Sequence, residues 1–360
     1  MNPFHSCLVI ALRTILTQGG DAPGARPFST RESNIINNRD YRNNMSKPLT
    51  AFFAVAILLA LPLAGCLEEQ VAEKEKIEAE ELIEVDNPCS MPSESILQSM
   101  TTIQAHGVDR YFRLTVPSSE IGTKLPIVLA FHGGGGAEED FPQQDEFDAL
   151  AEQEKFIMAY VIAEEDRTES EGEWFLNSAA TSRDDNIFSE AIVDELSKSY
   201  CIDEERLYAV GYSLGSMFTY EVACQLNTKF AAVASFAGTM PVSPETCNLY
   251  GSMGVMHIHG KLDLLIDYDD DWDWKDGEHE GVGTMSNIPG MIDYWADKSN
   301  CQDENSHYHL DVEHIVHSKC SSGVLVEHYG LEFGGHSWPQ EVAGIETYQL
   351  MWQFLFQFTN

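Results

Sequence analysis

The chain has 360 residues, of which 43% are hydrophobic and 10% aromatic, a composition typical of a globular protein and not of a disordered or fibrous one. Its 58 acidic side chains against 21 basic ones give a formal net charge of −37 at pH 7. A surface this negative repels phosphates and anionic headgroups, which excludes nucleic acid as a partner.

The N-terminal part has the pattern of an export signal. Residues 1–44 are polar and lack hydrophobic periodicity, so we expect them to be non-structural or to precede a true start at Met45. Residues 45–65 contain a positive charge followed by an apolar run that is shorter than the roughly 20 residues of a membrane span. Small residues then precede Cys66, which predicts a lipoprotein-type signal peptide with Cys66 lipidated. An ordinary signal peptide or an uncleaved anchor remains the alternative.

An acidic segment separates this signal from the folded part. Residues 67–87 carry nine acidic residues and two lysines, with few large apolar side chains. We expect residues 66–88 to form a tether and residues 89–360 to form one domain. The predicted location is the cell surface or the outer membrane, with the lipid as the contact to the membrane.

Six of the eight cysteines lie in the predicted domain. An even number in an exported domain favours three disulfides, whose pairing the spacing leaves open. The cysteines lack the C-x-x-C spacing that is typical of a zinc ribbon. We predict neither a metal nor a cofactor. The six are Cys89, Cys201, Cys224, Cys247, Cys301 and Cys320.

Strand patterns and helix patterns alternate along the domain. We expect strands at residues 110–117, 125–131, 157–163, 206–212, 231–238, 255–259 and 323–333. We expect helices at residues 147–156, 184–200, 214–226, 285–298 and 345–358. This alternation predicts an α/β fold with a mostly parallel central sheet and helices on both faces.

One Gly-x-Ser-x-Gly motif, residues 211–215, lies between a predicted strand and a predicted helix. This context is typical of a turn that presents a nucleophilic serine above a sheet, here Ser213. Glycines are required because side chains on either side would collide in so tight a turn. The alternative is a serine that caps an ordinary helix.

A serine nucleophile needs a base, and the base needs an orienting acid. Asp263 follows the strand at 255–259, and His336 follows the strand at 323–333 after two glycines. The order Ser, Asp, His is that of an α/β-hydrolase. Asp267 is a rival acid, but Asp263 is nearer to the end of its strand.

The oxyanion of an acyl-transfer intermediate needs backbone donors. The amide of Leu214, directly after the nucleophile, is one candidate. Gly133 and Gly134 supply the other, because they follow a buried strand and allow the backbone to approach a substrate oxygen.

Four segments carry a resemblance to a known family. Residues 126–134 read Pro-Ile-Val-Leu-Ala-Phe-His-Gly-Gly, and residues 335–339 read Gly-His-Ser-Trp-Pro. With residues 200–234 and 257–263, they resemble the α/β-hydrolases of the poly(3-hydroxybutyrate) depolymerase and feruloyl esterase type, carbohydrate esterase family one and its relatives. The resemblance spans roughly residues 89–360.

The resemblance implies an α/β-hydrolase fold and a secreted serine esterase that uses Ser213, Asp263 and His336. Departures after the serine and after the acid leave the substrate open among hydroxybutyrate oligomers, feruloyl or acetyl esters of polysaccharides, and simple esters. The resemblance also implies a disulfide pairing: Cys224–Cys247, Cys301–Cys320 and Cys89–Cys201.

Other interpretations are kept open. The same triad serves peptidases and acyltransferases, and a non-catalytic surface lipoprotein could use a hydrolase scaffold. The acidic, Trp-containing residues 267–274 could bind calcium or cover the substrate, but a solvated loop is favoured. The histidines at 307, 309, 314 and 317 are interpreted as a solvated surface and not as a metal site.

Overall fold

The computed structural model describes residues 87–135, 140–163, 174–176, 184–244, 247–273 and 283–360. The predicted signal peptide, Cys66 and nearly all of the acidic tether lie outside these residues. Among the described helices, none is both long enough and apolar enough to cross a membrane.

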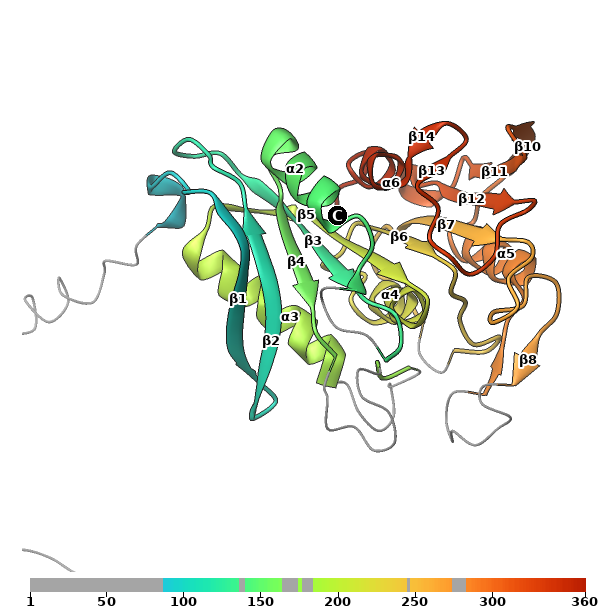
Figure 1. Cartoon of the computed structure of the whole chain (residues 1–360), viewed down its shortest axis with the longest axis horizontal. Coiled ribbons are helices and arrows are strands. Elements are labelled where there is room, and N and C mark those ends of the chain that lie inside the picture. Colours follow the sequence, from blue (N-terminus) through green and yellow to red (C-terminus); the bar gives the residue numbers. More distant parts are fainter. Residues whose placement is uncertain (1–86, 136–139, 164–173, 177–183, 245–246, 274–282) are drawn as a thin grey trace, which may run out of the picture. The chain divides into compact units, whose positions relative to one another are not determined.

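The described strands form one large sheet, shown in Figure 1, in the order β1-β2-β4-β3-β5-β6-β7-β12-β11-β10. The run from β4 to β12 in this order is parallel throughout, and antiparallel strands extend the sheet at both edges. The strands are β1 (Ile96–Ala105), β2 (Val108–Val116), β3 (Leu125–Phe131), β4 (Ile157–Val161), β5 (Ile202–Tyr212), β6 (Ala232–Phe236), β7 (Gly254–Gly260), β10 (Asp303–His309), β11 (Val312–Ser318) and β12 (Val326–Leu331).

Helices cover both faces of this sheet, and each face has its own hydrophobic cluster. Phe188, Phe218 and Trp295, from α3, α4 and α5, belong to one cluster. Phe147 and Trp352, from α2 and α6, belong to the other. The helices are α2 (Gln144–Glu154), α3 (Asp184–Ser199), α4 (Leu214–Gln225), α5 (Ile288–Lys298) and α6 (Thr347–Leu355).

The central strands are covered on both sides, so that even their polar residues, such as His257 and His259 of β7, are buried. Every residue of β3, β4, β6 and β7 is buried. The predicted α/β class, the parallel sheet and the helices on both faces are therefore confirmed.

Three strands of the large sheet, β1, β10 and β11, are absent from the predicted elements, and two of them, β1 and β10, form its edges. β1 is rich in Gln, Ser and Thr and is mostly half-buried or exposed, and β10 is exposed over almost its whole length. An edge strand with solvent on its side chains carries little hydrophobic periodicity, so its sequence does not distinguish it from a loop.

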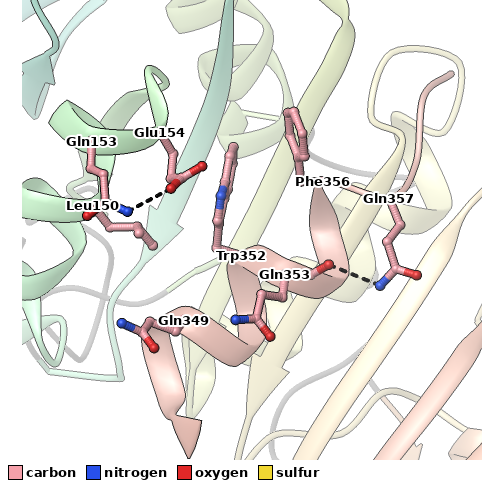
Figure 2. A pocket seen from close by; sticks show the side chains of 8 residues that line it. All are labelled: Leu150, Gln153, Glu154, Gln349, Trp352, Gln353, Phe356 and Gln357. Carbon is pink, nitrogen blue, oxygen red and sulfur yellow. Dashed lines mark hydrogen bonds between the residues drawn. The ribbon is translucent and has the colours of Figure 1, made fainter.

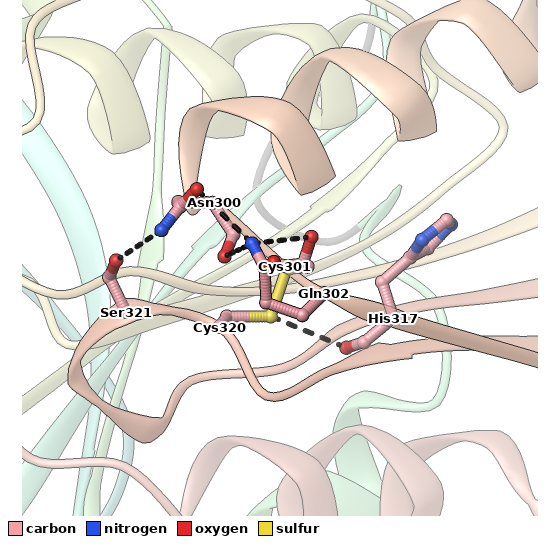
Figure 3. Close-up of a disulfide and its surroundings, with 6 residues drawn as sticks. All are labelled: Asn300, Cys301, Gln302, His317, Cys320 and Ser321. Atoms are coloured by element: carbon pink, nitrogen blue, oxygen red, sulfur yellow. Dashed lines mark hydrogen bonds between the residues drawn. A yellow bond between two sulfur atoms is a disulfide. The ribbon is translucent and has the colours of Figure 1, made fainter.

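Three disulfides brace the described part of the chain, Cys89–Cys201, Cys224–Cys247 and Cys301–Cys320. These are the pairs that the resemblance implies. Figure 3 shows that Cys301–Cys320 joins the end of α5 to the chain after β11, where the sulfur of Cys320 lies 3.6 Å from the carbonyl oxygen of His317.

Small two-stranded ladders complete the fold. β8 (Trp272–Asp273) pairs with β9 (Thr284–Met285), and β13 (Glu341–Val342) pairs with β14 (Ile345–Glu346). The turns that carry the predicted site residues follow the carboxyl ends of β3, β5, β7 and β12, so they meet at one edge of the parallel sheet.

Candidate active site

Ser213 occupies a strained turn between β5 and α4. Its backbone has φ 54° and ψ −119°, a left-handed conformation that non-glycine residues seldom adopt. Its N–H donates to the carbonyl oxygen of Phe236 at 2.9 Å. A Cβ on Gly215 would lie 2.1 Å from the carbonyl oxygen of Phe131, and one on Gly211 would lie 2.3 Å from that of Gly215. The predicted need for both glycines is therefore steric and specific.

The structure brings Ser213, His336 and Asp263 together. The Oγ of Ser213 lies 2.8 Å from His336 Nε2, and His336 Nδ1 lies 2.8 Å from Asp263 Oδ2. A carboxylate only accepts, so the ring proton is on Nδ1 and Nε2 accepts from the serine hydroxyl. The loops after β7 and β12 carry the acid and the histidine, and these two strands are paired neighbours.

Asp263 is completely buried as a side chain, whereas His336 keeps 18% of its side chain exposed. The other carboxylate oxygen of Asp263 accepts from the N–H groups of Leu265 and Ile266, at 2.8 and 3.0 Å. Burial raises the pKa of Asp263. The hydrogen bonds from His336 and from the two amides lower it by more than burial raises it, so the pKa of Asp263 lies below its usual value. The acid is therefore ionised.

The rival acid, Asp267, is exposed and takes part in a surface turn. Its Oδ1 accepts from the N–H groups of Asp269 and Asp270, both at 2.9 Å. The choice of Asp263 over Asp267 agrees with the contacts to His336.

The two glycines predicted for the oxyanion hole lie against the nucleophile turn. A Cβ on Gly133 would lie 3.4 Å from the Cβ of Ser213, and one on Gly134 would lie 3.1 Å from a methyl group of Leu214. The backbone after β3 therefore reaches the serine and the residue that follows it, as backbone donors to a substrate oxygen require.

The sequence reasoning missed the role of His132, which lies directly before these glycines and is fully buried. Its Nε2 accepts from the N–H of Ala163 at 3.1 Å, so its proton is on Nδ1, which donates to the carbonyl oxygen of Gly133 at 2.7 Å. Because the peptide is trans and planar, the N–H of Gly134 points away from the ring. The imidazole thus orients this peptide group.

Two further residues hold the loop that carries His336. The hydroxyl of Tyr212, within the serine motif, donates to the carbonyl oxygen of His336 at 3.1 Å. The indole of Trp338 donates to Gln143 at 2.9 Å and contacts the ring of Tyr212 edge-on. Tyr212 had a sequence signal, since it lies next to the nucleophile, but Gln143 had none.

The acidic residues near Asp263 serve as local hydrogen-bond acceptors. Asp271 accepts from the backbone and the side chain of Asn287, and Asp273 accepts from Thr284. In the β10–β11 hairpin, His307 and His309 are exposed, as a solvated surface requires, but His317 is buried, so that interpretation is wrong for His317. His314 contacts His307 and Glu327 at 3.3 and 3.0 Å. Over the described ranges, no group of three or more His, Cys, Asp or Glu side chains is arranged to hold a metal ion.

A separate pocket of about 590 Å³ lies between α2 and α6 (Figure 2). The ring of Trp352 is stacked on Phe156 and on Phe356, and the guanidinium of Arg206 lies over Phe356. The lining therefore combines these packed aromatic rings with the amide groups of four glutamines. Its lining residues, none of which belongs to the predicted site, are Leu150, Gln153, Glu154, Gln349, Trp352, Gln353, Phe356 and Gln357.

The chain is similar to several known esterases. The profile of the phospholipase/carboxylesterase family matches residues 118–271. A bifunctional acetylxylan esterase/xylanase of Neocallimastix patriciarum is 24% identical over 259 residues, which are 70% of this chain and 34% of that protein. Feruloyl esterase B of Piromyces equi is 23% identical over 193 residues, which are 52% of this chain and 34% of that protein. The chain thus spans about a third of the length of these relatives.

The solved structure of an acetyl xylan esterase from Aspergillus awamori has the same fold. It superposes with a TM-score of 0.51 at 16% identity, over 72% of this chain and 99% of that one. The protein has the α/β-hydrolase fold. Residues 118–271 match the phospholipase/carboxylesterase family, and acetylxylan and feruloyl esterases are among the proteins to which the chain is similar.

Proposed function

We propose that the protein is a serine esterase that cleaves carboxylic esters through an acyl-enzyme. The observation that carries the proposal is the unbroken chain of hydrogen bonds from Ser213 through His336 to the buried, ionised Asp263. Three side chains from three separate loops meet at the hydrogen-bonding distances that nucleophilic catalysis requires.

The proposed reaction follows from these contacts. The Oγ of Ser213 attacks the ester carbonyl while His336 Nε2 takes its proton, and Asp263 stabilises the imidazolium that forms. The amides of Leu214 and Gly134 or Gly133 stabilise the oxyanion, a contribution of about 3 kcal/mol for one donor. Collapse of the tetrahedral intermediate expels the alcohol, which receives the proton from His336. A water molecule, activated by His336 in the same way, then attacks the acyl-enzyme and releases the carboxylic acid product.

The substrate class is a proposal drawn from the relatives. The names of two of them refer to acetylxylan and to feruloyl esters, so acetyl or feruloyl groups on a polysaccharide are the first substrates to test. Hydroxybutyrate oligomers and simple esters follow from the resemblance described above. Each of these substrates is a carboxylic ester, whose carbonyl carbon an activated serine can attack.

The test is a substrate panel with p-nitrophenyl acetate, methyl ferulate, acetylated xylan and hydroxybutyrate oligomers, run on the protein and on Ser213→Ala. We expect hydrolysis of at least one ester by the protein, and none above the uncatalysed rate by the variant. Cleavage of peptides but not of esters would favour a peptidase, and transfer to an added alcohol in place of water would favour an acyltransferase. Equal rates for both proteins would favour a non-catalytic binding protein.

Export and anchoring belong to the same proposal. Three disulfides are typical of a protein that works in an oxidising compartment, which supports an extracellular location. We propose that residues 45–65 direct export, that Cys66 carries the lipid and that residues 66–88 tether the domain. In a host with lipoprotein machinery, radioactive palmitate should label the protein but not Cys66→Ser. Equal labelling of the two would refute the anchor.

A further inference from the structure

Three histidines lie buried behind the acid loop, and the proposed reaction uses none of them. His257 and His259 come from β7 and His328 from β12, and their exposed fractions are 0%, 0% and 1%. His257 and His259 are two residues apart in one strand, and His328 is the register partner of His257, so all three lie on one face of the sheet. Polar rings that are buried in this way must be hydrogen-bonded.

The bonds of His259 fix its tautomer. Its Nε2 lies 3.1 Å from the carbonyl oxygen of Ile266, which only accepts, so the proton is on Nε2. Its Nδ1 must then accept, and it does so from His257 Nε2 at 3.0 Å. The Nδ1 of His257 accepts in turn from the hydroxyl of Tyr220 or of Ser235, at 2.7 and 3.0 Å. The donors therefore point in one direction, from α4 and β6 toward the acid loop.

This series of bonds ends at the acid. Ile266, whose carbonyl oxygen accepts from His259, donates its own N–H to Asp263 Oδ1 at 3.0 Å. The Nε2 of His259 also lies 3.4 Å from Asp263 Oδ2, the oxygen that binds His336. The imidazole of His259 thus holds Ile266, whose N–H binds Oδ1 of Asp263. It also places the positive end of its own N–H dipole beside Oδ2 of the same carboxylate.

We propose that His259 is a positioning residue for Asp263, and that it acts as a neutral donor whose tautomer His257 enforces. The inference rests on the proposed function, since positioning matters for turnover only if Asp263 orients the base. The inference itself concerns the position of the Asp263 carboxylate, which can be examined without turnover. Without the Nε2 donor, the carbonyl group of Ile266 loses its hydrogen bond to β7, and the carboxylate of Asp263 no longer aligns with His336 Nδ1.

The neutral state of His259 is part of the proposal. Burial lowers its pKa to about 4, although Asp263 and Asp267 act in the opposite direction, and His257 is likewise held neutral by burial. A cationic ring at this position would form an ion pair with the carboxylate and compete with His336 for it. A neutral N–H orients the same carboxylate and leaves its charge for the imidazolium that forms in the reaction.

The test compares two substitutions at one position. Glutamine places an amide nitrogen where Nε2 lies and keeps the donor to Ile266, whereas asparagine is too short to reach it. We expect His259→Asn to lower kcat about 10- to 100-fold with KM little changed, because a misplaced catalytic group costs rate and not binding. We expect His259→Gln to stay within about threefold of the parent protein. Tyr220→Phe is the matched control, since Ser235 still reaches His257.

A spectroscopic readout separates this inference from the proposed function. We expect the proton between His336 Nδ1 and Asp263 to give a strongly deshielded signal in proton NMR, and its detection requires no turnover. We expect it to persist in His259→Gln and Tyr220→Phe and to weaken or shift in His259→Asn. If the parent protein hydrolyses no ester but this pattern is found, the positioning role stands and the proposed function fails.

Two outcomes overturn the inference. The first is a folded His259→Asn that keeps both kcat and the His336 proton signal. The second is an equal loss in His259→Gln and His259→Asn, since the size and burial of the ring would then matter and not its donor. If His259→Asn does not fold, His259→Gln decides alone, because the inference requires it to retain the proton signal.

Discussion

The nucleophile turn and the acid loop are held in place by different means. Ser213 is fixed by backbone sterics, because the chain at Gly211 and Gly215 passes so close to its neighbours that no side chain fits. Asp263 is fixed by hydrogen bonds from two amides of its own loop. In our proposal, a buried histidine behind the loop supports them through its hydrogen bond to the carbonyl oxygen of Ile266. The steric constraint at the nucleophile requires glycines at fixed spacing in the sequence, whereas the hydrogen bonds to Asp263 require no such glycines.

This difference determines which kind of substitution should disrupt each region. A steric constraint is broken by adding one carbon, and the backbone itself must then move. A hydrogen-bonded loop is broken by removing a donor or an acceptor, and it then loosens while the fold remains. The predictions below use this contrast, in order of decreasing effect.

The largest effect is expected from Gly215→Ala. The added Cβ would lie 2.1 and 2.4 Å from the carbonyl oxygens of Phe131 and His132, which are backbone atoms of β3 and of the chain that follows it. We expect turnover to fall by about 1,000-fold or more, since both the serine and the oxyanion region must shift. Gly335→Ala is the matched control, because its Cβ has no neighbour closer than 3.6 Å. Comparable ester turnover in these two variants would show that the turn is not sterically fixed.

The second prediction concerns the acid, Asp263. Asp263→Asn should lower kcat by about 10,000-fold, because the amide can no longer hold the imidazole in the required tautomer or stabilise its charged form. The overall fold should persist, as judged by circular dichroism. Asp267→Asn should change kcat by less than about threefold, since this side chain only closes an exposed turn. The opposite ranking would assign the acid to Asp267.

The third prediction concerns stability and the buried histidines. The pKa of His259 is lowered by burial to about 4 and that of His328 to about 3, while His257 lies well below its usual value. In the unfolded chain these rings titrate near pH 6.5, so unfolding takes up protons below that pH. Stability is therefore greatest above about pH 6.5 and is lost as the pH falls, until the folded pKa values are reached.

Three protons correspond to about 4 kcal/mol per pH unit between about pH 6 and pH 5. Denaturant unfolding at a series of pH values measures this slope. His328→Gln should remove about one proton from it, or about 1.4 kcal/mol per pH unit. A free energy of unfolding that does not change between about pH 5 and pH 7 would contradict the neutral, buried state of these rings.

The smallest effect on activity is expected from the disulfide at the β10–β11 hairpin. Replacing Cys301 and Cys320 together by serine removes a link between residues 19 positions apart, and the loss of stability should be about 3 kcal/mol in the chain-entropy view. Turnover at 25 °C should change little, because local hydrogen bonds hold the acid loop. A large fall in kcat of the folded variant would show that the hairpin supports the acid.

The sequence alone predicts the parts of this site that follow from sterics and order. Ser213 is recognised from its glycines and from the strand before it, and His336 from the glycines that precede it. Asp263 and Asp267 could be ranked only by their distance from the strand, since burial and contact with His336 depend on the folded loop. His259 looks like one polar residue in a buried strand, and no periodicity shows that its ring reaches the acid loop.

The fold divides in the same way. Every buried parallel strand was predicted, and β3 and β4 are continuous apolar runs. β1 and β10 lie at the edges of the sheet, where exposed polar side chains remove the hydrophobic pattern. The disulfide pairs follow from which loops meet in space, so spacing alone left them open and only the resemblance to a family implied them.

The most direct test of the central claim is covalent labelling by a fluorophosphonate, followed by mass spectrometry of the modified peptide. The account predicts one label per molecule, on Ser213, with no labelling of Ser213→Ala and much slower labelling of His336→Ala. This outcome requires an activated serine and is independent of the choice of ester substrate. Folded protein that takes up no label, or carries it on another residue, would contradict the assignment of Ser213 as the nucleophile.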